Sequence, residues 1–102
     1  PDAERELVIH LQEGFHHGLE AVITVDGREV YRGVPETNPV LGLAERVSVA
    51  AASARPRVTF ALPGKRINWS QQIDLSAGAA LGISVTEDGA VRIRQARAFG
   101  YD

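Results

Sequence analysis

Two Asp-Gly pairs, at positions 26–27 and 88–89, each stand between short runs of β-branched residues. This pattern is the strongest short-range signal for a β-hairpin, because both residues tolerate the positive φ that a type I′ turn requires. Further runs of alternating apolar and polar residues recur with turn residues about every 8 to 12 positions. We therefore predict an all-β chain with strands at 6–12, 20–26, 28–32, 45–50, 56–62, 66–75, 80–86 and 90–95. These would form one antiparallel β-sandwich of about seven or eight strands over residues 1–102, immunoglobulin-like or prealbumin-like.

Residues 43–55 also fit a second interpretation. Asn38 and Pro39 could cap a helix, and the alanines at 50–54 would tolerate one, so a short helix within 40–54 is the alternative. The alternation of Val47, Ser48 and Val49 favours a strand over 45–50.

Loop length predicts which residues share a face, because directly opposed residues of a hairpin point to the same side of the sheet. A two-residue turn at 26–27 pairs Ile23 with Val30 and Val22 with Tyr31, so Val30 faces the core and Tyr31 faces outward. At 88–89 only a three-residue loop, with Gly89 in the left-handed conformation, unites the apolar sets by pairing Val85 with Val91 and Ile83 with Ile93.

The turn at Pro63 and Gly64 is the third test of this rule. An even-length loop pairs Phe60 with Ile67 and Val58 with Trp69. The only tryptophan is therefore predicted to face the core.

Composition excludes several classes of protein. The chain has no cysteine, so disulfide scaffolds, cysteine-based zinc sites and cysteine nucleophiles are excluded. Its longest apolar runs are far shorter than the roughly 18 residues that span a membrane, so we expect a soluble chain without membrane insertion. The net charge of −2 gives no reason to expect a nucleic-acid partner.

Charge is unevenly distributed along the chain. Residues 1–45 carry nine acidic and three basic side chains, whereas residues 46–102 carry eight basic and four acidic ones. In a sandwich these segments interleave, so neutralisation across strands is one interpretation, and head-to-tail self-association is the other.

Candidate catalytic and metal sites are few. His10, His16 and His17 could share a metal ion, although their spacing matches no standard zinc pattern. No Gly-x-Ser-x-Gly elbow is present and no serine has a histidine near it in sequence, so we name no catalytic residue and no cofactor.

A possible partner surface follows from the predicted faces. Val8 and His10 would lie on the outer face of strand 6–12, and Val22 and Tyr31 on the outer face of the first hairpin. If those strands are neighbours, the four residues form an apolar patch for a protein partner or a homodimer contact.

The run from Val25 to Pro35 resembles the Val-Asp-Gly…Gly-x-Pro signature of PEGA-type domains, small β modules attached to bacterial envelope and signalling proteins. This resemblance implies a bacterial β module and assigns no functional residue. From the residues themselves we predict a cytoplasmic, non-enzymatic module for protein interaction or assembly. The alternative is a domain that binds a carbohydrate or a metal ion, or an enzyme, built around His10, His16 and His17.

Overall fold

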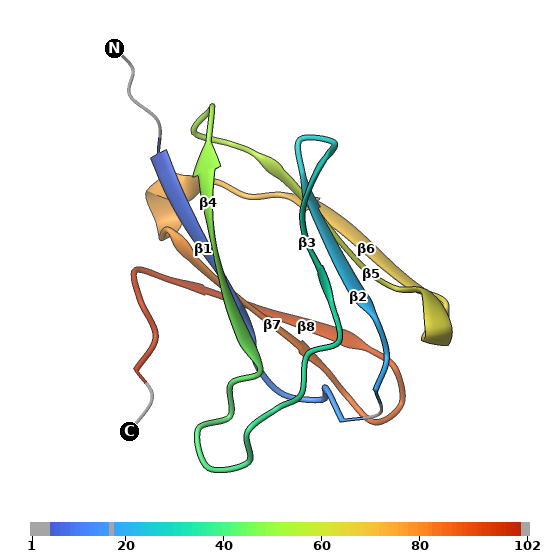
Figure 1. Cartoon of the computed structure of the whole chain (residues 1–102). Helices are drawn as coiled ribbons and strands as arrows, with labels where there is room; N and C mark the ends of the chain where they lie inside the picture. Colours follow the sequence, from blue (N-terminus) through green and yellow to red (C-terminus); the bar gives the residue numbers. More distant parts are fainter. Residues whose placement is uncertain (1–4, 17, 101–102) are drawn as a thin grey trace.

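A computed structural model describes residues 5–16 and 18–100 and shows a sandwich of two four-stranded sheets (Figure 1). Sheet A has the order β4-β1-β7-β8 and sheet B the order β3-β2-β5-β6. The strands are β1 (Arg5–Leu11), β2 (Ala21–Val25), β3 (Arg28–Gly33), β4 (Glu45–Ala51), β5 (Arg57–Leu62), β6 (Ile67–Gln72), β7 (Ala80–Val85) and β8 (Val91–Ala96). Two short 3₁₀ turns, η1 (Pro63–Lys65) and η2 (Leu75–Ala77), flank β6. The predicted all-β sandwich is confirmed.

The strand order refines that prediction. In an immunoglobulin sandwich the first two strands lie side by side in one sheet. Here β1 and β2 lie in opposite sheets, and β1 pairs in parallel with β7 and antiparallel with β4. The order thus differs from the immunoglobulin arrangement, and the parallel pair of β1 with β7 departs from the fully antiparallel sandwich that was predicted.

The core lies between the sheets and is formed by one face of each strand. The alternation of β1 places Leu7, Ile9 and Leu11 inward, where they are fully buried against Ile23 and Phe60 of sheet B. Such burial of large aliphatic and aromatic side chains stabilises each by about 1.5 to 3 kcal/mol. Within residues 40–54, all of which the structure describes, β4 occupies the stretch for which a helix was the alternative.

Two of the three turn predictions are confirmed in loop parity, which decides the face of the sheet on which the paired residues lie. β7 and β8 pair Val85 with Val91 and Ile83 with Ile93, and Gly89 has a φ of 89°. The β5–β6 connection also has even length, but its register is shifted by two residues from the prediction. Trp69 pairs with Phe60 instead of Val58, and Ile67 pairs with Leu62 instead of Phe60. Trp69 accordingly packs, half-buried, against the core.

The first hairpin departs from the prediction at one position. Asp26 and Gly27 both have positive φ, as a type I′ turn requires, and the two pairs next to the turn form as predicted. Beyond them a β-bulge shifts the register, so Ile23 pairs with Tyr31 instead of Val30. Tyr31 therefore faces inward with Ile23 and packs against the core, which corrects its predicted outward position.

Within the described residues, no helix has the length and apolar character needed to cross a membrane.

Candidate functional site

The outer face of sheet A carries an unusual set of polar residues. The register places His10 of β1 opposite Arg46 of β4 and Gly82 of β7, and Gly82 opposite Arg94 of β8. Two residues further along β7, on the same face, Ser84 lies opposite Arg92 of β8. We refer to His10, Gln12, Ser84, Arg92 and Arg94 as the outer site.

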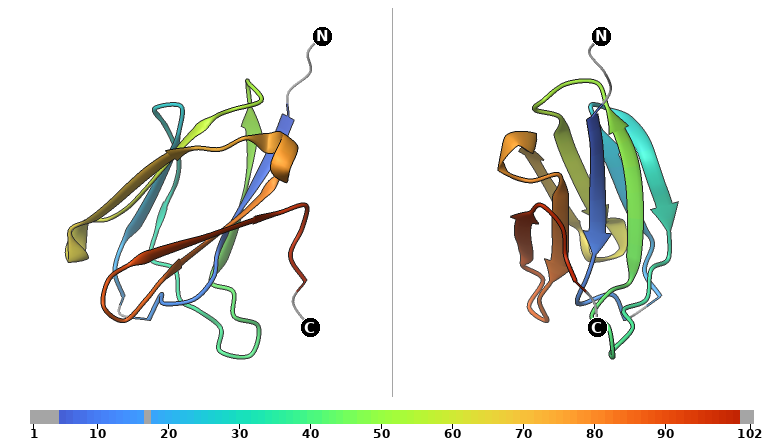
Figure 2. Two further views of the ribbon diagram at one scale, coloured as in Figure 1. Left: turned by 180° about the vertical axis from the view of Figure 1, so that it is seen from behind. Right: turned by 90° about the vertical axis from the view of Figure 1, so that its left-hand side faces the viewer.

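The segment after β8 covers part of this face. Figure 2 shows it crossing in front of sheet A when the sheet faces the viewer. The ring of Phe99 meets the imidazole of His10 nearly edge-on, with centroids 5.0 Å apart. The guanidinium carbon of Arg94 lies 5.0 Å from the centre of the same ring, which is a cation–π contact. The aromatic ring therefore fixes the position of Arg94 while it shields His10.

His10 is buried although it lies on the outer face of its strand, with 5% of its surface exposed. Burial, followed by the positive charge of Arg46, lowers the pKa of His10 below its usual range. The imidazole is therefore held neutral at pH 7.

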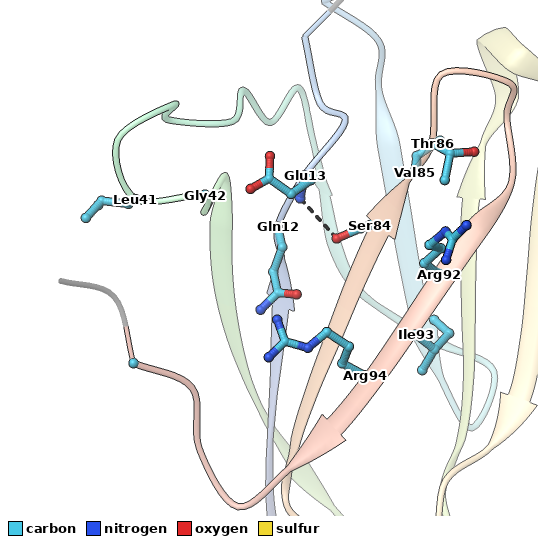
Figure 3. A pocket seen from close by; sticks show the side chains of 11 residues that line it. Gln12, Glu13, Leu41, Gly42, Ser84, Val85, Thr86, Arg92, Ile93 and Arg94 are labelled. Atoms are coloured by element: carbon cyan, nitrogen blue, oxygen red, sulfur yellow. Dashed lines mark hydrogen bonds between the residues drawn. The ribbon is translucent and has the colours of Figure 1, made fainter.

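Gly82 lets a side chain lie flat on the sheet. A Cβ atom at this position would stand 2.5 Å from Oε1 of Gln12, so the Gln12 side chain occupies the space that any larger residue would fill. Figure 3 shows the amide end of Gln12 beside the guanidinium of Arg94. A glycine inside a strand is the sequence signal that could have revealed this close approach.

A hollow of about 810 Å³ opens beside these residues (Figure 3). Its walls include the guanidinium groups of Arg92 and Arg94, the carboxylate of Glu13 and the loop around Leu41. The hydroxyl of Ser84 accepts a hydrogen bond from the N–H of Glu13 at 3.1 Å, which ties the end of β1 to β7. This volume falls within the range of ligand sites, and its polar groups suit recognition of a charged group.

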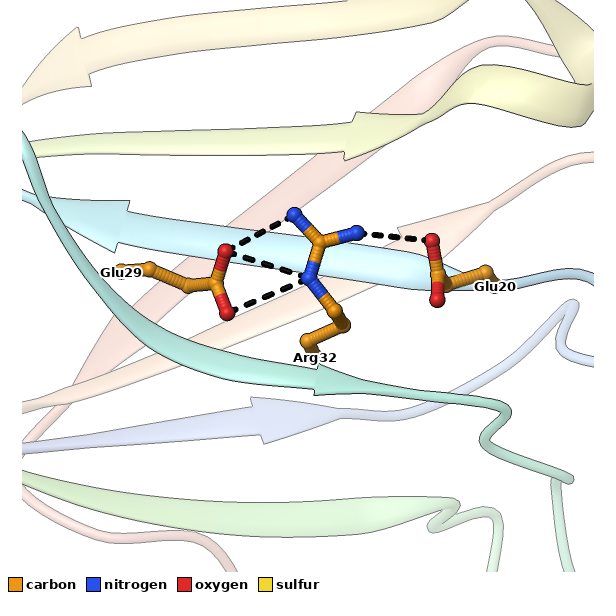
Figure 4. Close-up of polar contacts among 3 residues, drawn as sticks. All are labelled: Glu20, Glu29 and Arg32. Atoms are coloured by element: carbon orange, nitrogen blue, oxygen red, sulfur yellow. Dashed lines mark hydrogen bonds and ion pairs between the residues drawn. The ribbon is translucent and has the colours of Figure 1, made fainter.

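The arginines of the hollow differ from Arg32 of the opposite sheet in their ion pairs. Arg32 of β3 forms ion pairs with Glu20 at 2.9 Å and Glu29 at 2.8 Å (Figure 4). The hydrogen bonds from Arg32 lower the pKa of Glu29. Among the described residues, neither Arg92 nor Arg94 has a carboxylate within ion-pair distance. Both are exposed. The hydrogen bond from Thr86 and, to a smaller extent, the charge of Arg92 lower the pKa of Asp88, and Arg94 lies over the ring of Phe99.

The predicted patch of Val8, His10, Val22 and Tyr31 is not assembled. Val8 and His10 lie on sheet A, whereas Val22 lies on sheet B and Tyr31 faces the core. The prediction assumed that β1 neighbours the first hairpin, and the chain instead crosses to the other sheet after β1.

The structure places the two described histidines, His10 and His16, at different sites. His10 lies within sheet A, and His16 is exposed in the following loop, where it lines a second hollow of about 650 Å³ with Glu13, Lys65 and Glu87. His17 lies outside the described residues. Over residues 5–16 and 18–100, no group of three or more histidine or carboxylate side chains is placed to hold a metal ion.

Arg92, Arg94, Ser84 and Gln12 were not predicted from the sequence to form one site. The alternation of arginines in the strand could have placed Arg92 and Arg94 on one face, but their neighbours come from β1 and the tail. No family model, curated protein or solved structure matches the chain, so the likeness of residues 25–35 to PEGA-type domains has no support from a family match.

Proposed function

We propose that this chain is a non-enzymatic module for protein interaction or assembly that binds its partner through the outer site of sheet A. The observation that carries this proposal is the pair of exposed guanidinium groups, Arg92 and Arg94, beside a hollow and without an ion-pair partner in the described chain. Charged groups of this kind raise the rate of encounter and select partners of opposite charge.

The chemistry of the hollow supports recognition rather than catalysis. A nucleophilic serine needs a positioned base, whereas the Ser84 oxygen accepts a backbone N–H and serves the fold. The neutral, covered imidazole of His10 likewise packs beneath Phe99. The bacterial origin and cytoplasmic location expected from the sequence stay predictions.

A small anionic ligand is the second candidate. The volume of the hollow, about 810 Å³, suits a small molecule as well as a peptide. A carboxylate held by Arg92 or Arg94 is the chemistry we expect for such a ligand.

An array of synthetic peptides incubated with the labelled full chain tests the main proposal. We expect acidic peptides to bind and to shift amide NMR signals at residues 10–13, 82–84 and 92–94. Arg92→Glu combined with Arg94→Glu should abolish binding, whereas the matched variant Arg28→Glu, at the exposed start of β3 in sheet B, should not. Absence of any binding peptide, or shifts confined to sheet B, would refute the proposal.

A further inference from the structure

β8 is an edge strand whose outer side is open over part of its length. It is the last strand of sheet A, so its ladder bonds to β7 on one side only. Its pairing with β7 shows no register shift and its sequence holds no proline, so two of the devices that protect an edge are absent. Its charged side chains, Arg92 and Arg94, are a third such device, and they repel a basic strand but not an acidic one. At its far end Gln95 donates hydrogen bonds to the carbonyls of Asp74 and Gly78, at 2.7 and 2.8 Å. Among the described residues, the backbone of residues 91–94 forms no hydrogen bond outside its ladder with β7, so these residues are the open part.

The side chains of this open part define what could be added to it. Arg92 and Arg94 lie on the outer face, and Ile93 between them faces the core and is half-buried. In a neighbouring strand, residues two apart share a face and have the same spacing of about 7 Å. A strand that complements Arg92, Ile93 and Arg94 thus has the pattern acidic, apolar, acidic.

The sequence of this chain contains that pattern at Asp2, Ala3 and Glu4. We propose that residues 2–4 of a second copy add as a strand to the edge of β8. Asp2 and Glu4 then lie opposite the two arginines and Ala3 lies opposite Ile93, in either strand direction. Residues 1–4 lie outside the described residues.

The same segment cannot reach β8 of its own molecule. Ser84 pairs with Arg92, and the parallel register of β1 and β7 places Ser84 level with Gln12. Arg92 therefore lies seven residues along the sheet from Arg5, at about 23 Å. The four residues before Arg5 span at most about 14 Å when fully extended. The contact must be made between molecules.

Each copy then offers one donor segment and one acceptor edge. Such a head-to-tail contact is heterologous, so it produces rings or open chains instead of a two-fold dimer. This inference deepens the proposed function, because it rests on Arg92 and Arg94 as the partner-binding residues and names the partner as a second copy.

Sedimentation of the full chain over a range of concentrations tests this contact. We expect the average mass of the wild-type chain to rise with concentration and to fall when salt is added, since exposed charges are screened. The donor variant D2K/E4K and the acceptor variant R92E/R94E should each associate at least about tenfold more weakly. Arg28→Glu and Glu36→Lys, which change exposed charges elsewhere, are the matched controls and should leave association unchanged.

Mixing the two charge-reversed variants is the decisive measurement. Lysines on the donor then meet glutamates on the acceptor, so an equimolar mixture should form a one-to-one complex although neither variant associates alone. Circular dichroism melting of each variant checks that it is folded. A wild-type chain that stays monomeric at about 1 mM, or a mixture that does not pair, overturns the inference.

The failure of this inference differs from the failure of the proposed function. If the chain is monomeric while acidic peptides from the array still bind the outer site, only strand exchange between copies is wrong. If the chain is monomeric and no array peptide binds, the outer site has no partner role and both proposals fail.

Discussion

The ring of Phe99 stands over the imidazole of His10, with the two ring centroids 5.0 Å apart and the planes at 75°. Phe99 follows the last strand and His10 belongs to the first, so this contact joins the two ends of the described chain across the outer face of sheet A. An edge-to-face pair of this kind contributes about 0.5 to 1.5 kcal/mol beyond the area that it buries.

Phe99→Ala should therefore destabilise the fold by about 1 to 2 kcal/mol. The loss includes the contacts of the ring with His10 and Arg94, and it stays modest because Phe99 is only half-buried. Urea unfolding followed by tryptophan fluorescence measures this change in free energy. Val40→Ala, which shortens an apolar side chain with 82% of its surface exposed, is the control and should change stability little. Equal effects of both substitutions would show that the tail does not pack on the sheet.

The lowered pKa of His10 makes stability depend on pH in a defined direction. In the unfolded chain the imidazole titrates near its usual value of about 6.5. Because the folded protein binds the proton less tightly, the contribution of neutral His10 is present above about pH 6.5 and is lost as the pH falls toward the folded pKa. The free energy of unfolding, measured from pH 8 to pH 5, should fall in this window, and His10→Gln should remove that component. A curve for His10→Gln parallel to that of the wild-type chain would contradict the assignment.

The parity of strand pairing predicted the arrangement where turns alone determine it. The three-residue loop at Gly89 and the inward side of Trp69 depend on local chain geometry, and both agree with the structure. The rule failed at Tyr31, because a bulge inserts a residue without a sequence signal comparable to that of a turn. One such insertion moves every residue beyond it to the opposite face.

The outer site depends on contacts that no local pattern contains. Gln12, Ser84 and Arg94 come from β1, β7 and β8, and the parallel pairing of β1 with β7 follows from the path of the whole chain. Phe99 lies beyond the last predicted strand, and its position on His10 depends on where the tail turns. The sequence predicted the kind of fold, while the site required the arrangement of strands in space.

The inward position of Tyr31 changes what its substitution reports. Burial, followed by the charge of Glu45, raises the pKa of Tyr31, in agreement with its packing at the margin of the core. Tyr31→Asp should destabilise the fold by about 2 to 4 kcal/mol, because it removes packing and introduces a charge there. Thermal unfolding checks this, with Tyr31→Phe as the conservative control that should retain most of the stability. If Tyr31→Asp left the melting temperature unchanged, the bulged register of β2 and β3 would be wrong.

Gly14 links the end of β1 to β7 at a point where a side chain has no room. Its φ is +96°, and a Cβ atom there would stand 1.9 Å from the carbonyl oxygen of Val85. The nearest atoms all belong to the backbone of Val85 in β7, so the clash cannot be relieved by a change of rotamer. Gly14→Ala should therefore lower the free energy of unfolding by about 3 kcal/mol or more.

Gly27 supplies the matched comparison for Gly14, since its φ is +82° but nothing lies within 4 Å of a Cβ atom built there. Gly27→Ala should cost only the penalty of the left-handed conformation, about 1 to 2 kcal/mol. Urea unfolding of the two variants side by side separates steric exclusion from backbone strain. Similar losses of stability in both would show that the chain can move away from Val85, and the close approach of the loop after β1 to the end of β7 would then not be a fixed feature of the outer site.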